Sequence, residues 1–171
     1  MRGTIGSIWG LCGISLLLGG AIVRLGRIGL DTFTHELDWR HWTALAASVL
    51  LLALWEGYQG FQQRFSPRFA ARLRTLRTHP STVRTLLAPL YCMGFFHATR
   101  RRKIASYALT AGIVILVVLV RRLPQPWRGI VDIGVVGGLA WGLVTVYWQS
   151  FLALTRADYD VAPETPPPSR Q

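Results

Sequence analysis

The chain has 171 residues, of which 51% are hydrophobic and 16% are charged, and its mean hydropathy is +0.33. Roughly 20 apolar residues span a bilayer core, and the chain contains four such stretches, which leave little room for a separate soluble domain and exclude a large water-soluble enzyme. The formal net charge is +11. Because half of the residues are apolar, we assign this excess of positive charge to a loop that faces anionic lipid, and not to a nucleic-acid interface. The sequence predicts an all-α membrane protein.

The first predicted span covers residues 4–23, where no charged residue occurs until Arg24. A cleaved signal peptide is an alternative, because Arg2 precedes the apolar run. The uncharged stretch is longer than the apolar region of a signal peptide and has no small-residue cleavage site. We therefore expect this segment to be retained as a helix.

The second predicted span covers residues 41–62, with tryptophans at its start that are typical of a membrane interface. Glu56 lies inside this span, about seven residues or roughly 10 Å from its end. A carboxylate in hydrocarbon must be protonated, paired or hydrated. We expect a hydrogen bond to Tyr107 or Thr110, which lie at a similar depth. A pair with Arg64, or a role as a coupling acid for protons or cations, is the alternative.

Residues 64–103 contain ten basic residues and no acidic one, which places this loop in the cytoplasm by the positive-inside rule. Ser66 and Pro67 are a helix-start signal. The apolar residues that follow recur on one face, which predicts an amphipathic helix lying flat in the membrane interface. The stretch 86–96 is too short to span, so we expect it to be interfacial or re-entrant. The side chains predicted to bind anionic lipid or a partner protein are Arg68, Arg72, Arg77, Arg100, Arg101, Arg102 and Lys103.

The third and fourth predicted spans cover residues 104–120 and 130–154, joined by a short proline-containing turn that makes them an antiparallel hairpin. Asp132 is expected to pair with Arg128, four residues earlier on the same helix, or with Arg121 and Arg122 across the turn. Residues 161–171 are rich in proline and lack apolar periodicity, so we expect a disordered tail. The remaining residues, 1–160, form one transmembrane domain. With four spans, both termini lie in the cytoplasm.

Glycines recur in two of the spans at spacings that let another helix approach the backbone closely. The pattern predicts packing within the bundle, or contact with another chain in a homo-oligomer or larger complex. These glycines are Gly6, Gly10 and Gly13 in the first span and Gly134, Gly138 and Gly142 in the fourth.

The sequence contains no nucleophile elbow, phosphate-binding loop, dinucleotide fingerprint or zinc-protease helix, and its histidines do not lie at matching depths. We therefore expect no catalytic activity, cofactor or metal. Of the 19 basic residues 18 are arginines, a bias that suggests a GC-rich bacterial genome. We expect a non-catalytic scaffold, accessory or assembly protein of a bacterial inner membrane, with a basic loop that binds lipid or a partner. The alternative is a small oligomeric transporter or channel that uses Glu56.

Overall fold

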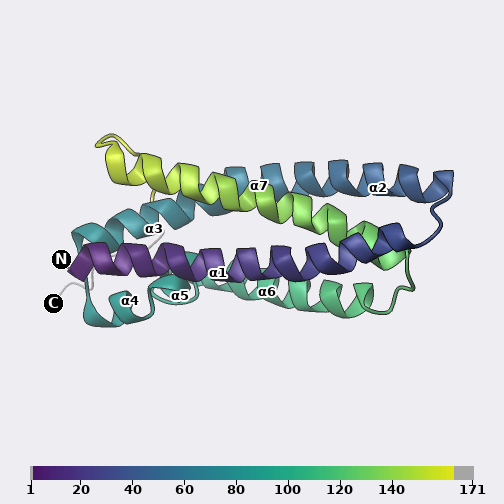
Figure 1. Ribbon diagram of the computed structural model, residues 1–171. Helices are drawn as coiled ribbons and strands as arrows, with labels where there is room; N and C mark the ends of the chain where they lie inside the picture. The colour runs from purple at the N-terminus through teal and green to yellow at the C-terminus, as the bar shows by residue number, and fades with distance from the viewer. Residues whose placement is uncertain (1, 164–171) are drawn as a thin grey trace.

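The computed structural model describes residues 2–163, and these residues form helices and connecting turns without any strand. Within that range, four helical segments are long and apolar enough to cross a membrane (Figure 1). The prediction of an all-α fold with four helices that could each span a membrane is confirmed. The four segments are Gly3–Thr34, Trp39–Thr78, Arg100–Val120 and Trp127–Thr155.

The elements follow one another in a simple order along the chain. They are α1 (Arg2–Asp31), η1 (Thr32–Thr34), α2 (Trp39–Leu52), η2 (Ala53–Phe65), α3 (Ser66–Thr78), α4 (Thr82–Leu86), α5 (Ala88–Met93), α6 (Arg100–Val120) and α7 (Trp127–Thr155).

The second helical segment is much longer than the sequence predicts. From the sequence, the second span is expected to end at residue 62 and a separate surface helix to begin at Ser66. In the structure, α2, η2 and α3 are continuous, and Ser66 has helical backbone angles instead of capping a new helix. The intervening η2 is wound as a π-helix, and the backbone N–H of Ser66 donates to the carbonyl of Phe61, five residues back. Pro67, which has no N–H to donate, lies just after the junction and does not end the helix.

The helices alternate in direction, so that the chain reverses at two ends of an elongated bundle (Figure 1). The start of α1, the end of α3, the short helices α4 and α5, and the end of α7 lie at one end. The α1–α2 and α6–α7 connections lie at the other. We call the first of these the basic end, because it carries residues 64–103.

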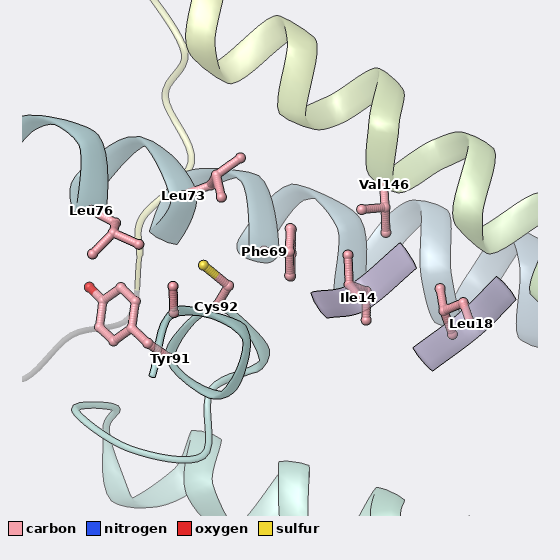
Figure 2. Close-up of a cluster of buried hydrophobic side chains, with 9 residues drawn as sticks. Ile14, Leu18, Phe69, Leu73, Leu76, Tyr91, Cys92 and Val146 are labelled. Atoms are coloured by element: carbon pink, nitrogen blue, oxygen red, sulfur yellow. The ribbon is translucent and has the colours of Figure 1, made fainter. Parts of the chain in front are cut away.

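The best-packed core lies at the basic end, where α1, α3, α5 and α7 converge (Figure 2). Helix α3 contributes the stripe Phe69, Leu73 and Leu76, at spacings of four and three residues, and each of these side chains is fully buried. The expectation that this stripe lies on lipid is therefore wrong, because it packs inside the protein. The other members of the core are Ile14, Leu18, Ala88, Tyr91, Cys92 and Val146.

The stretch predicted to be interfacial or re-entrant forms α5, which packs against α1 and α3. It is preceded by an exposed segment, where Trp9 of α1 donates an indole N–H hydrogen bond of 3.1 Å to the carbonyl of Leu86. Gly94 ends α5 with a φ of 90°, a conformation that glycine adopts without steric cost.

Helix α6 is the most apolar of the four segments that could span a membrane, and its apolar part is as little buried as that of the segment Trp39–Thr78. Of its described residues, Ser106 is the buried one, and the side chains from 107 to 119 are exposed. In a membrane these apolar side chains contact lipid tails.

Candidate functional site: the basic end of the bundle

The basic end divides its arginines into an internal set and an exposed set, a division that the sequence analysis did not predict. Arg72 belongs to the internal set, because only 1% of its surface is exposed. Its Nη1 donates a 2.8 Å hydrogen bond to the carbonyl of Tyr91, and its guanidinium carbon lies 5.2 Å from the centre of the Tyr91 ring. Arg84 approaches the same ring at 5.6 Å. The expectation that Arg72 binds lipid or a partner is wrong, because it is a core residue.

Arg74 also serves the fold, by holding the segment that follows α7. Its guanidinium donates to the carbonyls of Ala157 at 2.8 Å and Tyr159 at 3.1 Å. The hydroxyl of Tyr159 in turn lies 3.0 Å from the carbonyl of Pro67 and 3.1 Å from Oε1 of Gln149. Burial raises the pKa of Tyr159, so the hydroxyl remains a donor at neutral pH. The chain after α7 is therefore fixed to α3 through residue 159.

The predicted disordered tail begins just beyond this attachment. Val161 and Pro163 line a cavity of about 410 Å³ together with Arg74 and other residues of α3 and with His79, which follows α3. Residues 164–171 lie outside the described part of the chain.

The exposed set consists of cations that the fold leaves at the surface. Arg68 and Arg102 are half-buried and have interactions of their own, and the side chain of Arg102 lies next to Gly94. Since residues 64–103 contain no carboxylate, the exposed side chains are not neutralised from within this segment. We call the following side chains the cationic surface: Arg77, Arg100, Arg101 and Lys103.

Tyr91 and Cys92 occupy the centre of the basic end and are fully buried. Burial raises the pKa of the Tyr91 hydroxyl, while the guanidiniums of Arg72 and Arg84 oppose that shift. Burial raises the pKa of the Cys92 thiol to about 12. Because the thiolate is the reactive form of cysteine, Cys92 is an inert core residue.

Glu56 lies in η2 and faces α7, away from the partners that the sequence suggests. A Cβ atom added to Gly138 would lie 3.3 Å from Cβ and 3.4 Å from Oε2 of Glu56. Tyr107 and Thr110 lie on α6, which is separated from η2 by α1 (Figure 1). The Thr110 hydroxyl donates to the carbonyl of Ser106 on its own helix. The predicted hydrogen bond between α6 and Glu56 is therefore wrong, and within residues 2–163 no hydrogen bond to its carboxylate is formed.

The glycines of α7 lie against the α2–η2 segment of the same chain. A Cβ on Gly134 would meet Ser48, and a Cβ on Gly142 would meet the ring of Phe61. The glycines of α1 contact the basic end instead. A Cβ on Gly6 would lie 3.2 Å from Leu76, one on Gly10 would lie 3.2 Å from Leu73, and one on Gly13 would meet Pro89.

Two further features concern ions. Arg128 and Asp132 form the expected pair at 3.7 Å, in which Asp132 is buried. Within residues 2–163, no three His, Cys, Asp or Glu side chains are grouped so that they could hold a metal ion.

The internal roles of Arg74, Tyr91 and Tyr159 were missed by the sequence analysis. Each depends on a contact between residues 10 to 92 positions apart in the chain. The one available signal was the position of Arg72 beside the apolar stripe of α3. Comparison of the chain with models of protein families, with curated proteins and with solved structures gives no match.

Proposed function

We propose that the protein is a non-catalytic scaffold of a bacterial inner membrane, whose cationic surface binds the anionic cytoplasmic leaflet. The observation that carries the proposal is the division of the arginines at the basic end. Arg72 and Arg74 are committed to the fold, whereas Arg77, Arg100, Arg101 and Lys103 remain exposed.

The energetics favour lipid as the ligand of this surface. Each Lys or Arg near an anionic leaflet contributes about 1 kcal/mol, so four exposed cations contribute about 4 kcal/mol. The position of the termini follows from the same assignment. Because the start of α1 and the end of α7 lie at the basic end, both termini would be cytoplasmic (Figure 1).

The test is to extract the protein with its surrounding lipid in polymer-bounded particles and to measure the fraction of anionic lipid. The test variant replaces the four cations of the cationic surface by glutamine. The matched control replaces Arg121 and Arg122, which are also exposed but lie at the opposite end. We expect enrichment of anionic lipid around the wild type and the control, and loss of enrichment around the test variant. Equal lipid composition around all three proteins would refute the proposal.

A second function is supported by the surroundings of Glu56. A carboxylate at this depth that receives no hydrogen bond from residues 2–163, and that packs beside the small Gly138, has the features of a proton- or cation-coupling acid. The corresponding function is transport by a small oligomeric carrier or channel.

Reconstituted vesicles with an internal pH dye distinguish the two functions. A transporter gives a proton flux that is lost in Glu56→Gln and retained in Gln59→Glu, in which the acid is added at an exposed position. A scaffold gives no flux with any of these proteins.

A further inference from the structure

A groove of about 700 Å³ runs along one face of α1, in the half of the helix that is distant from the basic end. Its lining is mainly apolar or small and ends in two arginines. The residues that define it are Leu16, Gly19, Gly20, Val23, Arg24 and Arg27.

The glycines of this groove differ from the other glycines of α1. A Cβ on Gly10 would press on side chains of the same protein, whereas a Cβ on Gly19 or Gly20 would meet no atom within 4 Å. Packing within the chain therefore does not require glycine at these two positions. The groove that they form is open to a molecule outside the chain.

The length of the groove matches one leaflet of a bilayer. Its lining extends over 13 residue steps, from Ser15 to Ile28. At 1.5 Å per residue this is about 20 Å, compared with about 15 Å for half of a bilayer core. The additional length contains Arg24 and Arg27, so that these cations lie toward the surface of the bilayer and the apolar lining lies toward its midplane.

The two arginines lack an anion supplied by the described protein. Both are exposed, and within residues 2–163 no carboxylate lies within ion-pair distance of either guanidinium. Arg24 directly follows the uncharged stretch and precedes the end of α1 by seven residues, or roughly 10 Å, so it lies at the edge of the apolar part of the helix. An arginine in a membrane span requires an anionic or strongly polar partner. A phosphate accepts paired N–H donors from a guanidinium with good geometry.

We infer that this groove binds one anionic phospholipid of the leaflet opposite the cationic surface. Arg24 and Arg27 donate hydrogen bonds to its phosphate oxygens, and one acyl chain lies along Leu16, Gly19, Gly20 and Val23. This site is separate from the cationic surface and does not depend on the proposed function.

The test is native mass spectrometry of the full chain after delipidation in detergent and titration with phosphatidylglycerol. Two variants remove the site in different ways. Arg24→Gln with Arg27→Gln removes the phosphate ligands. Gly20→Leu fills the groove, and we expect the fold to be retained because a Cβ at this position meets no atom of the protein within 4 Å. Thermal unfolding is recorded for each variant in parallel.

We expect one tightly bound phosphatidylglycerol on the wild type and affinity losses on the order of tenfold or more in both variants. Phosphatidylcholine with the same chains should bind more weakly than phosphatidylglycerol. The fourfold glutamine variant of the cationic surface and Arg121→Gln with Arg122→Gln should retain this lipid, which separates the site from general charge effects.

Four results would overturn the inference. The first is unchanged binding in Gly20→Leu, and the second is equal loss in the Arg121 and Arg122 control. The third is a disulfide between two copies of Gly20→Cys in the membrane, because this would identify a second copy of the chain as the occupant of the groove. Binding of inorganic phosphate with the same affinity as the lipid would show an anion site without an acyl-chain groove.

Discussion

Replacement of Arg72 by glutamine should destabilise the protein far more than replacement of Arg101 by glutamine. Both residues are arginines of the same basic segment, but Arg72 is 1% exposed and Arg101 lies at the surface. The pair therefore separates the structural role of an arginine from its contribution to net charge.

The expected magnitude follows from the contacts of Arg72. Its hydrogen bond to the Tyr91 carbonyl is charge-assisted, and loss of such a bond costs about 1.5–3 kcal/mol. Its position over the Tyr91 ring adds about 0.5–2 kcal/mol. Glutamine is too short to reproduce either contact, so we expect a total loss of about 2–5 kcal/mol. At Arg101, a surface substitution should change stability by about 0.5 kcal/mol or less.

The assay is unfolding of the purified full chain in mild detergent, followed by tryptophan fluorescence during titration with SDS. We expect a clear shift of the unfolding midpoint for Arg72→Gln and an unchanged midpoint for Arg101→Gln. Equal midpoints for the two variants would refute the assignment of Arg72 to the core.

Three further predictions follow from other contacts. Gly138→Ala should lower the free energy of unfolding by about 1–3 kcal/mol, because the added Cβ would lie 3.1 Å from the carbonyl oxygen of Leu52. Gly137→Ala should be neutral or stabilising in the same SDS titration, and equal effects of the two substitutions would contradict the observed α2–α7 packing. The Cys92 thiol should resist maleimide at pH 8 in the folded protein and react after unfolding, and labelling of the folded protein at the rate of the unfolded protein would show that the thiol is exposed. Because burial raises the pKa of this thiol from the unfolded value of 9.0 to about 12, the free energy of unfolding should fall by about 1.4 kcal/mol per pH unit between these two values. Tyr159→Phe removes the hydroxyl that contacts Pro67 and Gln149, so it should release the segment after α7 and increase cleavage of that segment by protease without altering the four long helices. Unchanged cleavage would show that the hydroxyl does not hold this segment.

The number and approximate position of the spans could be predicted from the sequence, because apolar length depends on residues that are neighbours in the chain. The Arg128–Asp132 pair was predictable for the same reason, since it joins successive turns of one helix.

The position of α3 could not be predicted, because an apolar stripe has the same spacing whether it faces lipid or protein. Phe69 and Leu73 are equally consistent with both environments until α1 and α5 are placed beside them. The partner of Glu56 was mispredicted for a related reason. Tyr107 is at a matching depth, but depth does not determine which helices are neighbours, and α7 instead of α6 packs against η2.

Which arginines of the basic end are internal and which are exposed also could not be predicted from the sequence. Arg72, Arg74 and Arg101 have the same chemistry and similar local surroundings in the chain. They differ in three dimensions, because Arg72 donates to a carbonyl of α5, Arg74 donates to carbonyls of the segment after α7, and Arg101 is exposed.

The orientation of the basic end is the central claim of the proposed function, and cysteine labelling in spheroplasts tests it most directly. Arg101→Cys and Leu123→Cys, both exposed and at opposite ends of the bundle, are made in a background without Cys12 and Cys92. A membrane-impermeant maleimide should label residue 123 in intact spheroplasts and residue 101 after lysis only. Labelling of residue 101 in intact spheroplasts would place the cationic surface outside the cytoplasm and contradict the proposed function.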